Sequence, residues 1–287
     1  MTVHHLDCAT MCPIGGRLLI GSGGPLVGRL SAHCLLVEGD RGLTLVDTGF
    51  GTADVADPRR LGRTLRAAAR PRLAAATTAL HQVRALGHDP RDVRHIVLTH
   101  LDPDHAGGIG DFPHARIHVL ADELRAALAP PTRAERDRYR AAQWAHGPRW
   151  AEHRADAATE DWFGFGAIPV QPDDAAGFLL VPLPGHSRGH CGVAVRDGAG
   201  GWLLHCGDAY FSRADSDPAG PRRPPGLAAF QRLAALDNRG RLETLARLRG
   251  LRRDHAGEVR LICAHDPADL VLPGHPPRAD DRGGRGA

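Results

Sequence analysis

One short stretch, LTHLDPDHAGG at residues 98–108, constrains this chain more than any other part of it. It places His100, Asp102, Asp104 and His105 within six positions, directly after an apolar run typical of a buried strand. Carboxylates packed so closely repel each other unless a cation lies among them. The stretch therefore predicts a metal site whose remaining ligands must come from elsewhere in the chain.

Length and composition limit the classes of protein that are possible. With 287 residues, 42% of them hydrophobic, the chain can bury a large core as one domain or two. All 36 basic residues are arginine, since the sequence contains no lysine. A P-loop phosphate site and a Schiff-base site both need a lysine ammonium group, so these two enzyme classes are excluded.

Charge and hydropathy give no sign of a large acidic or lipid partner. The formal net charge is +3, and the arginines alternate with acidic residues and alanines, so we expect no nucleic-acid partner. The N-terminus lacks the features of a signal peptide, and no apolar stretch of about 18 residues is present for a membrane helix. We therefore expect no membrane partner and a cytoplasmic protein, while the oligomeric state stays open.

The pattern of apolar runs and turn residues predicts a mixed α/β chain. Residues 34–46 have the pattern of a β-hairpin, and residues 59–86 that of a helical region ending at Gly87. We expect a single domain over residues 1–275, with a helical insertion at about 121–166, and a disordered tail at 276–287. Further elements are expected as strands at 95–99, 115–120, 177–183, 191–195, 201–206 and 258–264, and as helices at 121–128, 132–145 and 241–251.

Polar residues follow the ends of several predicted strands. His186, Asp208 and His265 each come shortly after an apolar run, as His100 does. Short loops at strand ends are where rigid scaffolds hold functional side chains, so these residues are expected to meet in space. They are the candidate ligands that the opening stretch requires.

The blocks LVDTGFG, THLDPDHAGG, PGHSRGH, GDA and AHD, in this order, resemble the metallo-β-lactamase superfamily. The resemblance implies an α/β (α+β) fold, the four-layer αββα sandwich, with a dinuclear metal site at one edge. By position it assigns His100 and His186 to the first metal. It assigns Asp104, His105 and His265 to the second metal, with Asp208 bridging, Asp47 orienting a ligand and His190 in a supporting place.

Within the superfamily the chain is most similar to the N-acyl-homoserine-lactone lactonase-like branch. One position departs from the usual H-x-H-x-D-H motif, because Asp102 stands where the second histidine belongs. A carboxylate there also resembles the flavodiiron branch. The cofactor is expected to be two divalent metal ions, zinc by family, with iron or manganese favoured by the harder ligand Asp102.

The chemistry implied is hydrolysis by a metal-bridging hydroxide, with Asp104 or Asp208 relaying a proton to the leaving group. Tyr210 either hydrogen-bonds the substrate or packs in the core. Several aromatic residues gather in the insertion, where they form either an apolar substrate wall or a local core. The candidate substrate-binding residues among them are Tyr139, Trp144, Trp150 and Phe163.

A small-molecule lactone or ester is the leading substrate hypothesis. A thioester hydrolase of the glyoxalase II type would share the same metal site and differ in its pocket. Because of Asp102, an iron-dependent oxidoreductase is a further alternative. A non-catalytic protein that only binds a metal or ligand is the remaining alternative.

Overall fold

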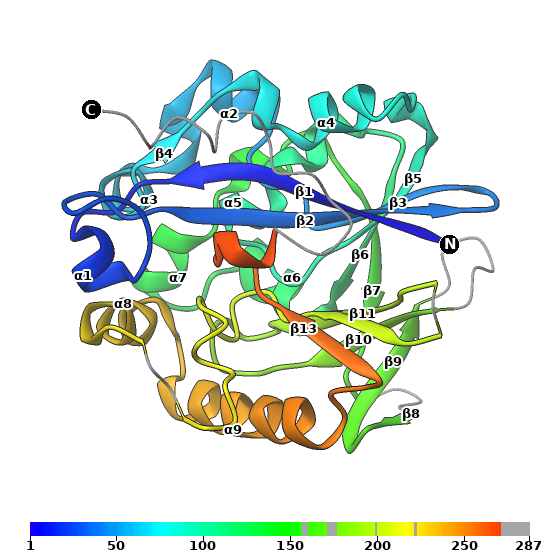
Figure 1. Ribbon diagram of the computed structural model, residues 1–287. Coiled ribbons are helices and arrows are strands. Elements are labelled where there is room, and N and C mark those ends of the chain that lie inside the picture. Colours follow the sequence, from blue (N-terminus) through cyan, green and yellow to red (C-terminus); the bar gives the residue numbers. More distant parts are fainter. Residues whose placement is uncertain (157–159, 171–176, 199, 221–222, 271–287) are drawn as a thin grey trace, which may run out of the picture.

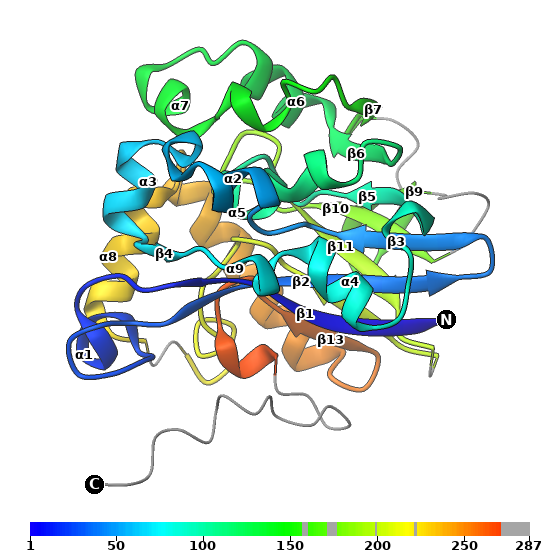
Figure 2. The ribbon, with the colours of Figure 1, turned by 90° about the horizontal axis from the view of Figure 1, so that it is seen from above.

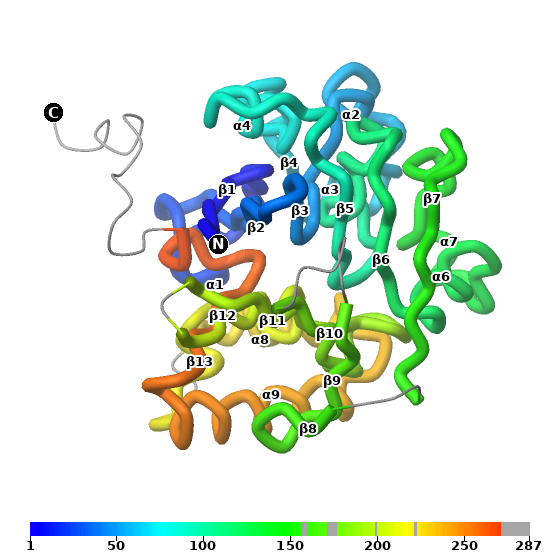
Figure 3. The backbone as a smooth tube through the Cα atoms, turned by 90° about the vertical axis from the view of Figure 1, so that its right-hand side faces the viewer, coloured from blue at the N-terminus to red at the C-terminus, as the bar shows by residue number. Residues whose placement is uncertain are grey.

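The computed structural model describes residues 1–156, 160–170, 177–198, 200–220 and 223–270. Two β-sheets pack face to face, and helices cover their outer faces (Figure 1). Seen along the strands, the sheets form two stacked rows with α4 outside one and α9 outside the other (Figure 3). The fold is therefore the αββα sandwich predicted from the sequence. The tail at 276–287 lies outside the described residues.

The first sheet is mixed, and β5 in its parallel half leads into the loop that holds His100, Asp102, Asp104 and His105. The predicted hairpin is confirmed, because β2 pairs antiparallel with β3 and the two strands close at the Gly39–Gly42 pair. β3, β5, β6 and β7 then run parallel to one another. In spatial order the strands are β4 (Pro71–Arg72), β1 (Thr2–Met11), β2 (Leu30–Gly39), β3 (Gly42–Val46), β5 (Val93–Val97), β6 (Arg116–Leu120) and β7 (Arg149–His153).

The second sheet is antiparallel except at one edge. There β12 and β13 run parallel, so both strands end on the same side. In spatial order the strands are β13 (Val259–Ile262), β12 (Trp202–His205), β11 (Cys191–Arg196), β10 (Phe178–Pro182), β9 (Phe165–Val170) and β8 (Glu160–Trp162).

The helices are short except for α9 on the outer face of the second sheet, and Figure 2 shows their arrangement from above. Their bounds are α1 (Gly16–Ile20), α2 (Thr52–Ala56), α3 (Arg63–Ala68), α4 (Ala79–Ala85), α5 (Pro103–Ala106), α6 (Ala121–Leu128), α7 (Arg133–Arg138), α8 (Pro225–Ala234) and α9 (Asn238–Asp254). No helix in the described part of the chain is long and apolar enough to cross a membrane.

The core between the two sheets fixes their distance and angle. Buried β-branched and leucine side chains from both inner faces meet there, among them Val97 from β5, Leu180 from β10 and Val193 from β11. Alternate residues of the same strands face outward into separate cores beneath the helices, as Ile96 does. Strands buried on both faces explain why these runs are almost continuously apolar.

The predicted helical region at 59–86 is only partly helical. α3 ends at Ala68 and α4 begins at Ala79, with a two-residue strand, β4, between them. Arg70 has a positive φ of 50° and precedes Pro71, which disfavours helix at the residue before it. The predicted stop at Gly87 is confirmed, because Gly87 has a φ of 89° and the His88 N–H closes the helix onto the Val83 carbonyl.

The helical insertion predicted at 121–166 is correct only in its first part. α6 matches the predicted helix at 121–128, but α7 ends at Arg138 rather than near 145. Residues 149–153 supply β7 to the first sheet, and residues 160–162 and 165–170 supply β8 and β9 to the second. β7 and β8 lie at the edges of the two sheets, where their backbone groups pair with a neighbouring strand. No local sequence pattern revealed these two strands.

The inter-sheet core predicts a strong dependence of stability on Leu180, which is fully buried. Leu180→Ala should lower the free energy of unfolding by about 2–5 kcal/mol, because it leaves a cavity between the sheets. Leu233→Ala is the matched control, since Leu233 is 85% exposed on α8. Urea denaturation of both variants checks this, and equal losses from the two would contradict the assigned core.

Candidate metal centre

Four loops bring the predicted ligands together at one edge of the sandwich. His100 follows β5, His186 follows β10, Asp208 follows β12 and His265 follows β13, each within four residues of the strand's end. These side chains lie far apart in the sequence, yet they form two adjoining groups of possible metal ligands. The sequence-based expectation that they meet in space is confirmed.

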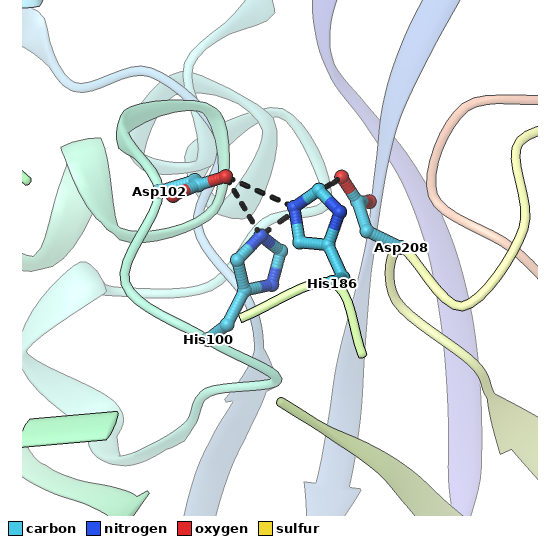
Figure 4. A group of neighbouring side chains, drawn as sticks. All are labelled: His100, Asp102, His186 and Asp208. Atoms are coloured by element: carbon cyan, nitrogen blue, oxygen red, sulfur yellow. Dashed lines mark hydrogen bonds and ion pairs between the residues drawn. The ribbon is translucent and has the colours of Figure 1, made fainter. Parts of the chain in front are cut away.

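The first group consists of His100, Asp102, His186 and Asp208, whose ligand atoms all lie within 4.8 Å of one another (Figure 4). Asp208 Oδ2 lies 3.3 Å from His186 Nε2 and 3.9 Å from His100 Nε2. Asp102 Oδ2 approaches the same two nitrogens, at 3.1 and 3.3 Å. Two imidazoles thus face two carboxylate oxygens.

The second group consists of Asp104, His105 and His265, and Asp208 joins it with its other oxygen. Asp208 Oδ1 lies 3.2 Å from His105 Nε2 and 3.0 Å from His265 Nε2. Asp104 Oδ2 lies 3.9 Å and 3.7 Å from the same two nitrogens. Asp208 Oδ2, which faces His186, also lies 3.1 Å from His265 Nε2. Asp208 therefore contacts ligands of both groups, as expected of a bridging ligand.

Unpartnered polar atoms show that these residues suit metal ions. His100 Nε2, His105 Nε2 and Asp208 Oδ1 are buried without a hydrogen-bond partner among the described residues. Leaving such atoms unpaired is costly, and imidazole nitrogens with carboxylate oxygens are the ligands that divalent transition metals prefer. A cation in each group would satisfy them.

The protonation states follow from burial and charge. Burial alone would raise the pKa of Asp208, but the imidazoles of His265 and His105 hold it well below the usual range. Burial would lower the pKa of His105, whereas Asp208 and Asp104 raise it well above normal. The cluster therefore draws positive charge, as protons or as metal ions. By contrast, burial and Arg138 lower the pKa of His186 to about 4, which leaves its imidazole neutral at pH 7.

Backbone and side-chain acceptors fix the ligand rings. His105 Nδ1 donates to Asp47 Oδ2 at 2.8 Å, and His265 Nδ1 donates to the Ser31 carbonyl at 2.7 Å. Asp47 also accepts two hydrogen bonds from Thr99, beside His100. These contacts place the proton on Nδ1 and turn the Nε2 lone pair toward Asp208. These contacts agree with the orienting role that the resemblance implied for Asp47.

His190 holds the backbone of Asp208 in position through its two ring nitrogens. Its Nδ1 donates to the Leu183 carbonyl, and its Nε2 accepts from the Asp208 backbone N–H at 2.9 Å. Burial lowers the pKa of His190 well below its usual value, so the ring is neutral. The supporting place that the resemblance gave this residue agrees with the contacts.

Sequence reasoning missed a buried carboxylate, Glu123, that ties two ligand loops together. Glu123 Oε1 accepts from the Leu101 backbone N–H at 3.0 Å and from the Tyr139 hydroxyl. Its Oε2 accepts from Ser187 Oγ at 2.7 Å and from the Gly189 N–H at 2.9 Å. No motif marks Glu123, because its partners come from three separate segments.

The aromatic residues proposed as a substrate wall pack elsewhere. Tyr139 is buried and its hydroxyl is used by Glu123, while Trp144 and Trp150 pack on the core outside the first sheet. Trp150 pairs with Ile117, which pairs with Ile96, four residues before His100 along β5. These placements favour the alternative reading, in which the aromatic residues form a local core.

Phe163 and Tyr210 also lie away from the cluster. Phe163 packs against His255 beyond the end of α9, with ring centroids 4.7 Å apart. Tyr210 is buried in the core beneath α9, near Cys206 and Cys263. The packing role that the sequence allowed for Tyr210 is the one that its surroundings support.

Phe211 is the aromatic residue that lies beside the ligands. Its ring centroid is 4.5 Å from that of His265 and 6.1 Å from that of His186. It belongs to an apolar cluster with Phe50 and Leu227, and Phe230 packs against it. No local sequence pattern marks this cluster, because Phe50 and Phe211 come from segments far apart in the chain.

A second set of possible ligands lies away from these loops. His4, Glu38 and His88 also approach within 4.8 Å of one another. Their side chains are 18%, 37% and 26% exposed, and His4 and Glu38 already form an ion pair. The buried cluster around Asp208 is therefore the candidate metal centre.

Comparison with known proteins agrees with this geometry. Residues 27–275 match the metallo-beta-lactamase superfamily. The chain is 46% identical over 266 residues to a probable metallo-hydrolase of Mycobacterium tuberculosis, covering 92% of this chain and 80% of the relative. It is 29% identical over 233 residues to an N-acyl homoserine lactonase of Azorhizobium caulinodans, covering 81% and 80%.

A solved structure shares the fold. It is an N-acyl homoserine lactone hydrolase with the product N-hexanoyl-L-homoserine bound at the catalytic metal center. The TM-score is 0.67 at 21% identity, and the match covers 93% of this chain and 95% of the other.

The contacts of Glu123 predict that it holds the ligand loops in place. Glu123→Gln should lower the free energy of unfolding by about 1–3 kcal/mol, because an amide N–H₂ would face backbone and hydroxyl donors that now meet a carboxylate oxygen. The variant should also bind metal more weakly. Thermal unfolding with and without added zinc measures both effects. Unchanged stability and unchanged zinc binding would remove Glu123 from this role.

Proposed function

The chain belongs to the metallo-β-lactamase superfamily, and we propose that it opens a lactone or ester bond as a metal-dependent hydrolase. The observation that carries the proposal is the position of Asp208 between the two groups, where its carboxylate oxygens lie 3.0 to 3.9 Å from Nε2 of His100, His186, His105 and His265. A carboxylate shared in this way suits two neighbouring divalent cations. Two such cations supply an activated water at neutral pH and polarise a carbonyl group.

The proposed roles follow from the contacts. His100, Asp102 and His186 would hold the first cation and Asp104, His105 and His265 the second, with Asp208 contacting ligands of both. Asp47, Thr99 and His190 keep ligand rings and the bridge in position. We keep Asp104 or Asp208 as the group that relays a proton to the leaving oxygen, and Tyr210 has no part in the proposed chemistry.

The lactone preference rests on two observations. Curated relatives and a solved structure with the same fold act on N-acyl homoserine lactones. In this chain, the Phe211 ring lies beside the imidazoles of His265 and His186. An acyl chain bound next to the reacting carbonyl would approach this ring. Zinc is the proposed metal, with iron or manganese as the alternatives that Asp102 keeps open.

The test is a panel of lactones, linear esters and thioesters assayed with the metal-loaded protein. Lactone opening should be the fastest reaction, should vanish after chelation and dialysis, and should return with zinc, manganese or iron(II). Faster thioester cleavage would favour the glyoxalase II type of activity. Stoichiometric metal without turnover of any of these substrates would contradict the proposal.

Asp208→Asn should abolish lactone hydrolysis and lower the metal content, because a neutral amide would replace the shared anion. Asp111→Asn is the matched control. Asp111 accepts from the Thr52 N–H and makes no contact with the ligand cluster. Elemental analysis and initial rates of both variants decide the matter. Turnover by Asp208→Asn at the wild-type rate would remove Asp208 from the site.

Phe211→Ala should raise KM more for long-chain than for short-chain acyl lactones. The lost apolar contact corresponds to about 1–2 kcal/mol for the longer chain. Trp150→Ala serves as the control and should change both KM values equally or not at all. Metal content is measured in parallel, since Phe211 touches His265. An equal effect of Phe211→Ala on both chain lengths would place the acyl group elsewhere.

A further inference from the structure

Asp102 divides its two carboxylate oxygens between the ligand cluster and a guanidinium group. Oδ2 lies 3.1 Å from His186 Nε2 and 3.3 Å from His100 Nε2 (Figure 4). Oδ1 lies 3.3 Å from Nε of Arg138, the last residue of α7. The residue that departs from the family motif is therefore also the one that carries an arginine partner.

Arg138 is held rigidly and has little access to water. Its side chain is only 12% exposed. Nη1 donates to the His186 carbonyl at 2.6 Å, and Nη2 donates to the Ala234 carbonyl at the end of α8. The guanidinium thus joins α7, the His186 loop and α8. A buried cation anchored in this way needs an anion close by, and Asp102 supplies it.

The Asp102–Arg138 ion pair changes the net charge of the ligand set. The usual motif has a neutral imidazole at position 102, so its ligands carry two negative charges from two aspartates. Here Asp102 adds a third negative charge, and Arg138 adds one positive charge beside it. We propose that Arg138 is a positioning residue that neutralises Asp102 and fixes its oxygen toward the first metal, so that the pair replaces the missing histidine.

The proposal predicts that the effects of substitutions at Asp102 and Arg138 depend on each other. Asp102→His alone would leave the buried Arg138 cation beside imidazoles and metal ions without its ion-pair partner. Arg138→Met alone would leave Asp102 buried without its guanidinium and would release the His186 carbonyl. The double variant restores a neutral ligand and removes the unpaired cation. This inference rests on the proposed metal centre, but not on which ester is the substrate.

The experiment is a double-mutant cycle on the full chain, with zinc affinity measured by competition against a chromophoric chelator. In the Asp102→His background, adding Arg138→Met should raise zinc affinity by about tenfold and raise the thermal midpoint. In the wild-type background, the same substitution should lower the thermal midpoint and bring no such gain in affinity. Arg138→Lys keeps the positive charge. In the wild-type background, its zinc affinity should lie between those of the wild type and Arg138→Met.

Arg60→Met is the matched control. Arg60 Nε contacts Asp54 at 3.0 Å and its Nη2 donates to the Ala142 carbonyl at 2.7 Å, so it repeats the same pattern away from the ligands. Its loss should lower the thermal midpoint without changing zinc affinity. A change in affinity from Arg138→Met that is the same in both backgrounds would overturn the inference, as would an equal change from Arg60→Met. Absence of bound zinc in the wild type would instead overturn the proposed metal centre.

Discussion

Three carboxylates and four imidazoles are held within contact distance in a site almost closed to water. The repulsion among Asp102, Asp104 and Asp208 is offset only when positive charge lies between them. This requirement explains why so much of the surrounding structure is polar and buried. Asp47, Glu123 and Arg138 form hydrogen bonds to the ligand loops and the segments beside them rather than to solvent.

The sandwich makes this concentration of charge possible. β5, β12 and β13 end next to the cluster, and the apolar core between the sheets keeps these ends at a fixed separation. Short loops then leave the ligand side chains little freedom to move apart. Stability of the core and competence of the site are therefore linked, because loosening the sheets would separate His100 from Asp208 and His265.

The ligands themselves were predictable from the sequence, since each stands directly after an apolar strand and belongs to a recognisable block. The β2–β3 hairpin and the helix stop at Gly87 were predictable for the same reason, because local residues determine them. The contacts of Glu123 and Arg138 were not, since their partners lie 16 to 96 residues away in the sequence and are brought close only by tertiary packing. The sequence left open whether the aromatic residues of the insertion form a substrate wall or a local core, because clustering in sequence does not distinguish a core from a pocket. The packing of Trp144 and Trp150 favours the core. Phe211, the residue beside the ligands, lies outside the aromatic-rich insertion, and its only aromatic neighbour in sequence is Tyr210.

The central claim is that Asp208 lies between two cations, one on each side. Diffraction data collected at the zinc absorption edge from crystals of the zinc-loaded protein test it most directly. The account predicts two anomalous peaks, one among His100, Asp102 and His186 and the other among Asp104, His105 and His265, with Asp208 between them. A single peak, or peaks only at other places on the protein, would contradict it.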